Sequence, residues 1–286
     1  MSAIATRAAA LVGRRSRARA GSWLGMTGAV IVGIVVVVAV LAGVLAPHDP
    51  NGVDLLGSYR GPGAGHVLGQ DGSGRDVLSR LMYGARLSLL GPLAVVALAA
   101  LIGVPLGLVA GYVGGFLDGV LSRIFDVVFA FPTLLLATVI VATFGVGFKT
   151  AVIAVAVTYI PLLARVVRGG TLVEREKPYI DACRVQGFSA VRVCGLHLAP
   201  NLARLIFGQT ALYFGYALLD LAGLSFLGLG TQPPTADWGA MLWDASQGIF
   251  LQPFGAVPVA LAIVLVVIGF NLIADWLGDR SAESGR

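Results

Sequence analysis

The sequence is poor in charged residues, in cysteine and in histidine, and each shortage argues against a class of protein. Only 12% of its 286 residues are charged, about half the share found in an average soluble domain. Its two cysteines, Cys183 and Cys194, form no CxxC pair, and its three histidines, His48, His66 and His197, lie far apart along the chain. This spacing is not that of a metal site. We therefore expect neither metal binding nor thiol chemistry.

Motifs for nucleotide binding and catalysis are also missing from the sequence. No GxxxxGK[ST] phosphate-binding loop occurs, and the segment Gly228-Leu229-Gly230 ends an apolar stretch without a following lysine. No Ser/His/Asp or zinc-helix motif lies in the apolar stretches. We expect no catalytic residue and no cofactor in this chain.

Apolar residues make up 57% of the sequence and gather in six stretches. A membrane-crossing helix needs about 20 apolar residues, and prolines within it are tolerated when neighbouring helices surround it. The sequence predicts an all-α polytopic membrane protein with six transmembrane helices. The stretches cover residues 23–46, 87–112, about 121–144, about 150–167, about 205–229 and 254–277.

The remaining segments complete the predicted organisation. A basic tail covers residues 1–22, and a loop over residues 47–86 ends in a short helix at about 74–86. The five-helix core, residues 87–277, contains a polar loop over residues 169–204, and a tail follows at 278–286. The first stretch is too long for the apolar region of a cleaved signal peptide, so we interpret it as a retained helix.

The basic residues predict the orientation of the chain in the membrane. With the N-terminus inside, 15 of the 20 lysine and arginine residues fall in cytoplasmic segments, as the positive-inside rule requires. This places both termini and residues 169–204 in the cytoplasm and residues 47–86 outside. The net charge of +5 comes without an aromatic and basic binding module, so nucleic acid is not an expected partner, whereas membrane lipid is.

Residues 179–200 have the pattern of two short helices joined by a glycine. Tyr179, Ala182, Cys183 and Gln186 lie on one face of the first helix, and Gly187 permits a turn that other residues resist. The second helix covers residues 188–197, and Pro200 is expected to stop or redirect it. Such an element can dock into a groove of a partner, although an amphipathic connector on the membrane surface would show the same pattern.

This segment resembles the EAA signature of ABC importer permeases. That signature is Glu-Ala-Ala, three residues, Gly, nine residues and Ile-x-Leu-Pro, and the spacings here are the same. The corresponding residues are Asp181-Ala182-Cys183, Gly187 and His197-Leu198-Ala199-Pro200. Asp181, Cys183, His197 and Ala199 differ from the signature, and these differences leave the individual contacts open.

Other stretches are similar to the second permease of the dipeptide, oligopeptide and nickel importer family. They are residues 68–81 with 83–86, residues 126–132, residues 224–230 with 232–234 and 238–241, and residues 270–272 with Asp275. The resemblance implies a half-channel that pairs with a homologous sister permease in the bacterial plasma membrane. It also implies two cytoplasmic P-loop ATPase subunits that bind ATP and Mg²⁺, and an external substrate-binding protein, often a lipoprotein.

The resemblance implies roles for several residues of the loop. Tyr179, Asp181, Ala182, Cys183, Gly187, His197 and Pro200 would form the loop that couples the permease to an ATPase. Di- or oligopeptides are the expected substrates, with nickel chelates, glutathione or haem-like ligands as alternatives. A stand-alone membrane channel or enzyme remains as an alternative of another class.

Charged residues elsewhere are candidates for contacts with the substrate or with partners. Asp126 and Asp220 lie in or near apolar stretches, where an ionisable group is costly and often functional, although pairing with a polar neighbour would also explain them. Asp71, Arg75 and Asp76 belong to a run of alternating charges before the second stretch. Either a solvated external helix or contact with the binding protein or sister permease would account for this run.

Overall fold

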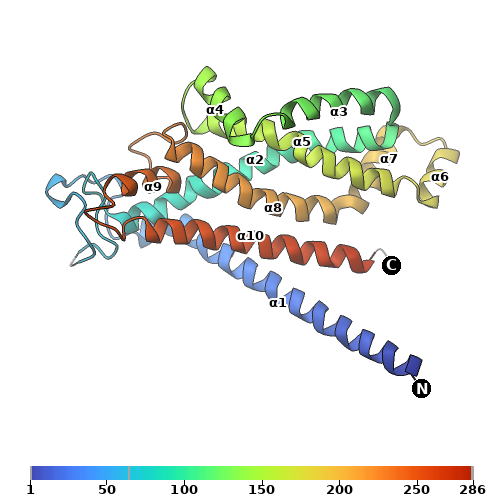
Figure 1. Ribbon diagram of the computed structural model, residues 1–286, viewed down its shortest axis with the longest axis horizontal. Helices are drawn as coiled ribbons and strands as arrows, with labels where there is room; N and C mark the ends of the chain where they lie inside the picture. The colour runs from blue at the N-terminus through green and yellow to red at the C-terminus, as the bar shows by residue number, and fades with distance from the viewer. Residues whose placement is uncertain (1, 64, 285–286) are drawn as a thin grey trace.

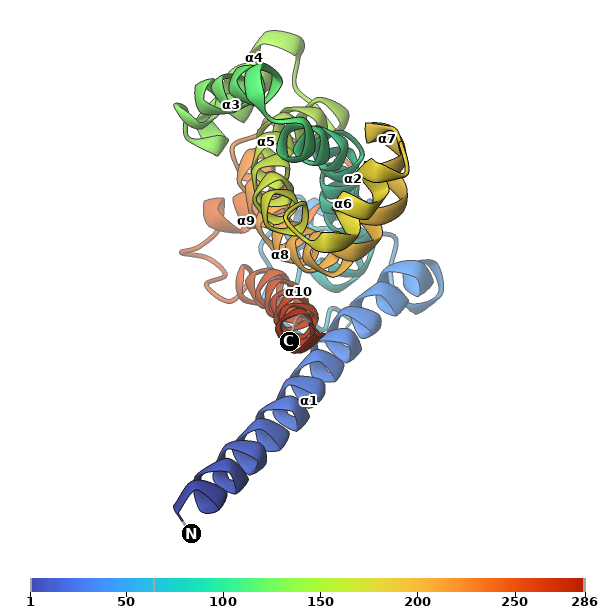
Figure 2. The same ribbon diagram turned by 90° about the vertical axis from the view of Figure 1, so that its right-hand side faces the viewer.

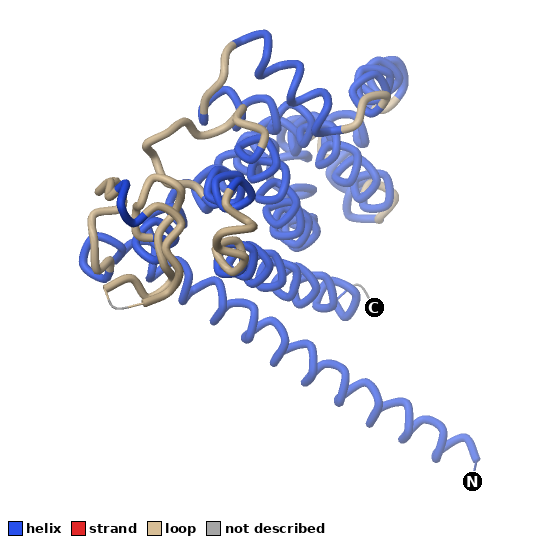
Figure 3. The backbone as a smooth tube through the Cα atoms, turned by 60° about the vertical axis from the view of Figure 1, so that its left-hand side comes forward, coloured by secondary structure: helices blue, strands red, loops and turns tan. Residues whose placement is uncertain are grey.

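The computed structural model describes residues 2–63 and 65–284 of the chain, and this part consists of helices and loops without a β-strand (Figure 3). The five long helices are α1 (Ser2–Leu45), α2 (Val77–Val113), α5 (Phe148–Glu174), α8 (Ala199–Phe226) and α10 (Val257–Ser284). The shorter ones are η1 (Leu55–Gly57), α3 (Gly115–Phe129), α4 (Thr133–Phe144), α6 (Pro178–Val185), α7 (Ala190–Val193), η2 (Cys194–Leu198) and α9 (Trp238–Gln247).

The number of membrane spans agrees with the six predicted. Five helices in the described part are long and apolar enough to cross a membrane, and α3 with α4 provides a sixth span if the pair is counted as one. The axes of α3 and α4 differ by 85°. Pro132, at the N-terminus of α4, has no backbone N–H and restricts the residue before it. The third predicted span is therefore sharply bent rather than one continuous helix.

The second span begins ten residues earlier than the sequence predicts, and the expected short helix at 74–86 is not a separate element. Residues 77–86 are the first turns of α2, and Asp76 caps the helix by accepting a hydrogen bond from the Ser79 N–H. Two arginines within residues 77–86 made this part of the helix hard to recognise from the sequence. Arg80 is buried, and the Arg86 guanidinium donates to the carbonyl oxygens of Ala39 and Val40.

Close packing of α2 against α5 forms the centre of the bundle. Gly103, Gly107 and Gly111 recur at every fourth position of α2 and face α5. A methyl group at position 107 would lie 2.5 Å from the carbonyl oxygen of Ala164. Small residues with this spacing let two membrane helices approach closely.

Different helices and loops lie at the two ends of the bundle (Figure 1). The loop between α1 and α2 and helix α9 lie at one end, which we call the α9 end. Helices α6 and α7 and the C-terminal end of α10 lie at the other, which we call the α6 end, and the N-terminal end of α1 points the same way. Viewed from the α6 end, α3 and α4 lie on the opposite side of the bundle from α1 and α10 (Figure 2).

Candidate coupling segment and α9-end pocket

The helix–glycine–helix expected near Gly187 is present at the α6 end. Gly187 follows α6 with a φ of +74°, a conformation that favours glycine. The N–H of Phe188 donates to the carbonyl oxygen of Cys183, and the N–H of Gly187 donates to that of Arg184. These two bonds form a Schellman motif, which ends a helix and reverses the chain. Ser189 then caps α7 by accepting from the N–H of Arg192. We call residues 178–198 the coupling segment.

The first helix of the coupling segment, α6, buries one side and exposes the other. Ile180 and Cys183 are buried beneath α6, whereas Ala182 and Gln186 are exposed. Tyr179 is half-buried, and Asp181 lies on the surface, where it pairs with Arg184 at 3.0 Å. Both cysteines of the chain are buried.

The outer face of the coupling segment is apolar on both sides of the turn. Val185 is 89% exposed and Val191 is 84% exposed, and Leu196 lies on the surface of the following turn. Gly187 between them has open space where a side chain would project. Exposed apolar side chains that are grouped together are typical of an interaction surface.

Polar contacts attach the coupling segment to the spans on both sides of it. The Tyr179 hydroxyl donates to Glu174 at the end of α5, at 3.0 Å, and accepts from the amide of Asn201 in α8, at 2.9 Å. Lys177 pairs with Glu174 at 2.8 Å. The Arg175 guanidinium donates to the carbonyl oxygen of Gly111 at the end of α2. Tyr179 therefore holds the segment to α5 and α8, and Arg175 holds the end of α5 to α2.

The prediction that Pro200 stops or redirects the second helix is wrong. Pro200 lies in the first turn of α8, and residues Ala190–Phe226 form one long helix through the π-helical turn η2. In this turn the N–H of Ala199 donates to the carbonyl oxygen of Cys194, five residues back. A wider turn of this kind accommodates a proline that has no N–H to donate. His197 in the same turn is half-buried and stacks on Phe188.

The two carboxylates within the apolar stretches have partners. Asp220 of α8 accepts a hydrogen bond of 2.8 Å from the Tyr159 hydroxyl of α5. Asp126 of α3 pairs with Arg165 of α5 at 2.7 Å, and both side chains of this pair are more than half exposed. Asp220 is thus internal, whereas the Asp126 pair lies on the surface of this subunit.

The run of charges before α2 forms a buried network rather than a solvated helix. Asp71 accepts from the side chain of Arg75 at 2.7 Å, and Arg80 lies 3.3 Å from the same carboxylate. Asp76 is also buried. Burial alone would raise the pKa of Asp76, but hydrogen bonds from His66 and Ser79 outweigh that effect and lower it.

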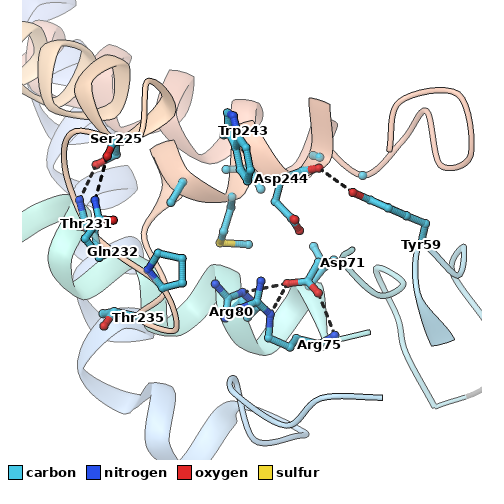
Figure 4. Close-up of a pocket in the computed structure, with 18 of the residues that line it drawn as sticks. Tyr59, Asp71, Arg75, Arg80, Ser225, Thr231, Gln232, Thr235, Trp243 and Asp244 are labelled. Carbon is cyan, nitrogen blue, oxygen red and sulfur yellow. Dashed lines mark hydrogen bonds and ion pairs between the residues drawn. The ribbon is translucent and has the colours of Figure 1, made fainter. Parts of the chain in front are cut away.

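A cavity of about 280 Å³ lies beside this network at the α9 end (Figure 4). Asp71, Arg75 and Arg80 line one side of it, and Trp243 and Asp244 of α9 line the other. Burial and the nearby Asp71 charge raise the pKa of Asp244, which accepts from the N–H of Gly72 at 3.1 Å. The cavity thus presents both signs of charge within an apolar wall.

Sequence reasoning missed Asp244 and Glu174 as parts of these sites. Asp244 lies 172 residues from its partner Gly72, and no local pattern indicates such a contact. Glu174 lies at the end of α5. Its role depends on contacts with Tyr179 and Lys177, which form only because the chain folds back after this helix.

Comparison with known proteins agrees with this architecture. A family described as binding-protein-dependent transport system inner membrane component matches residues 103–283, which include the whole coupling segment. The chain belongs to this permease family. The N-terminal transmembrane domain of oligopeptide transport permease C matches residues 21–62.

Two relatives of this permease have the same name and the same sequence identity to it. The glutathione transport system permease protein GsiD of Escherichia coli O157:H7 and that of Shigella sonnei are each 42% identical to the chain over 257 residues. The alignments cover 90% of this permease and 85% of each relative. The permease is therefore a subunit of an ABC importer of the oligopeptide and dipeptide type and a multi-pass protein of the inner membrane. This membership agrees with the expected transport role and not with a stand-alone channel or enzyme.

A solved structure has the same fold. The MetNI methionine ABC transporter, in inward-facing conformations, contains a chain that aligns with a TM-score of 0.58 at 16% identity. The alignment covers 73% of this permease and 97% of that chain.

Proposed function

We propose that this permease imports small peptides, glutathione among them, as half of a pathway that it forms with a sister permease. Two ATPase subunits bind ATP and Mg²⁺, and one of them receives the coupling segment. An external binding protein delivers the substrate at the α9 end. In this proposal the α6 end and both termini are cytoplasmic.

The apolar surface around Gly187 is the observation that carries this proposal. Val185 and Val191 project from a turn that protrudes at the α6 end, and a groove in a partner would cover both. The polar contacts to α5 and α8 make the segment a stiff link. A displacement of the docked ATPase would therefore move α5 and α8. The pathway would then switch between its inward-open and outward-open states.

The proposed pairing with a sister permease rests on the surface of α3 and α5. The Asp126–Arg165 ion pair is exposed there, close to apolar residues such as Val127 that are also exposed. Charged groups rarely face lipid hydrocarbon and usually face a bundle interior or a water-filled cavity. A second subunit that encloses this face would place the ion pair beside the pathway.

Transport by the assembled complex tests the proposed substrate class. The permease, its sister permease, the ATPases and the binding protein are reconstituted in vesicles, and ATP-driven uptake of a labelled dipeptide and of labelled glutathione is measured. We expect each to be taken up and to compete with the other. Uptake of a nickel chelate or a haem-like ligand that neither peptide inhibits would contradict the proposal.

Labelling of a single introduced thiol tests the proposed orientation. Cys183 and Cys194 are buried and give little background, whereas position 185 is well exposed. In Val185→Cys expressed without the ATPase subunits, which would cover this position, a membrane-impermeant thiol reagent should react in inverted vesicles and not in intact cells lacking an outer membrane. Reaction in the intact cells would contradict the orientation.

A further inference from the structure

Two of the three histidines, which lie far apart in the sequence, meet at the α9 end. The His66 Nδ1 atom lies 2.9 Å from the Asp76 Oδ1 atom, and the His48 Nδ1 atom lies 3.8 Å from the same oxygen. The two imidazole rings stack with their centroids 4.6 Å apart. His48 lies three residues after the end of α1, His66 lies later in the same loop, and Asp76 caps the start of α2.

The Asp76 carboxylate is held in place by its other oxygen. Oδ2 accepts from the Ser79 N–H at 2.8 Å and from the Ser79 hydroxyl at 2.7 Å. The same Ser79 oxygen accepts from the His48 N–H at 3.1 Å. Oδ1 therefore faces the two imidazoles, fixed by hydrogen bonds of the kind that orient ligands in metal sites.

The spacing of the three side chains suits a transition-metal ion. One ligand atom from each of His48, His66 and Asp76 can be chosen so that all three lie within 4.8 Å of one another. Metal bonds of about 2.1 Å separate neighbouring ligand atoms by about 3.0 Å in octahedral and about 3.4 Å in tetrahedral geometry. The observed 2.9 and 3.8 Å to Asp76 lie on either side of these values.

We propose that His48, His66 and Asp76 form a binding site for a divalent transition-metal ion of the zinc or nickel class. Two imidazoles and one carboxylate favour such ions over Mg²⁺ or Ca²⁺, which prefer oxygen ligands. His48 is part-exposed, with 41% of its side chain accessible, so an ion can enter from solvent and keep water in its remaining positions. The bound ion ties the end of α1 and its loop to the start of α2.

Binding by the full chain in nanodiscs tests the site. The protein is prepared without a polyhistidine tag and stripped of metal, and Zn²⁺ binding is measured by calorimetry and elemental analysis. We expect one ion per chain and a higher melting temperature with Zn²⁺. His48→Ala should weaken binding by at least about tenfold, since a change to a supporting residue alone costs about 10- to 100-fold.

The matched control is His197→Ala, which removes the one histidine outside the cluster and should leave Zn²⁺ binding unchanged. The His48 side chain is 41% exposed, so its variant should fold like the parent, as circular dichroism can check. Failure of the parent protein to bind one ion would overturn the site. Equal affinity in His48→Ala, or a loss that follows His197→Ala instead, would overturn it as well.

Discussion

The side-chain amide of Asn201 donates a 2.9 Å hydrogen bond to the hydroxyl of Tyr179, which lies 22 residues earlier in the chain. Tyr179 belongs to α6 of the coupling segment, and Asn201 belongs to the first turn of α8. The bond therefore closes the coupling segment onto the span that follows it. The hydroxyl of Tyr179 also donates to Glu174, so the same oxygen joins α6 to α5.

Tyr179→Phe removes both hydrogen bonds and keeps the ring. A hydrogen bond of this kind contributes about 1 kcal/mol, so we expect the loss of two to lower ATP-driven uptake by up to about 30-fold with little change in ATP hydrolysis. Uptake and hydrolysis are measured in the same vesicles. Asn201→Ala removes one of the two bonds and should lower uptake about fivefold, and the double variant should lose little more than Tyr179→Phe. Full additivity would show that the two residues act separately.

Gly187→Val tests whether the turn between α6 and α7 couples ATP hydrolysis to uptake. The φ of +74° strains a residue with a Cβ, at a cost of about 1–2 kcal/mol and more for a β-branched side chain. The variant should reach the membrane, but the ATPase subunits assembled with it should hydrolyse ATP without proportionate uptake. Gly195→Ala is the control, because Gly195 has open space around it and no positive φ. Normal uptake by Gly187→Val would contradict the coupling role.

Much of the bundle could be predicted from the sequence, because a membrane span must satisfy its own backbone and be apolar over a known length. The turn at Gly187 could also be predicted, since the short helices and the glycine are adjacent in the chain. The start of α2 could not, because Arg80 donates to the carbonyl oxygens of Pro50 and Pro234 and Arg86 donates to that of Ala39, all in distant segments.

The α9 end was the least predictable part of the permease. Asp244 meets Gly72 across 172 residues, and His48 meets His66 through a loop without periodicity. In the sequence, the charges near Asp71 form a local run and the histidines lie far apart. Contacts between distant segments depend on how the loops fold, which local patterns do not encode.

Gly107→Val tests the packing of α2 on α5. The added side chain would meet the Ala164 carbonyl oxygen and the Val167 side chain, and overpacking of this kind costs about 1–3 kcal/mol. We expect a lower melting temperature in detergent and poor assembly with the sister permease. Gly33→Ala adds a methyl group where nothing lies within 4 Å and should be neutral. Equal stability of the two variants would contradict the close contact.

The two acidic residues at the α9-end cavity should respond differently to loss of charge. Asp71→Asn leaves Arg75 and Arg80 without their shared carboxylate and should destabilise the protein by about 3 kcal/mol. Asp244→Asn removes repulsion from Asp71, and an asparagine can still accept from the Gly72 N–H. This variant should be as stable as the parent or more stable at neutral pH, as thermal unfolding can measure.

The pH dependence of Asp244→Asn follows from the direction of the pKa shift. The pKa of Asp244 is raised in the folded protein, so its contribution to stability is present below the unfolded pKa and is lost as the pH rises through the folded value. The advantage of the variant should therefore be largest at neutral pH and shrink on acidification. An advantage that grows on acidification would contradict the assignment.

Photo-crosslinking from the coupling segment tests whether this segment docks on an ATPase subunit. A photoreactive amino acid replaces Val185, and a control replaces Phe250, which is exposed and follows α9 by three residues in the chain. Helix α9 lies at the opposite end of the bundle (Figure 1). The assembled transporter is illuminated, and the adducts are identified by mass spectrometry. We expect an adduct with an ATPase subunit from position 185 and none from position 250. An intact complex that gives no ATPase adduct from position 185, or gives one from position 250, would contradict it.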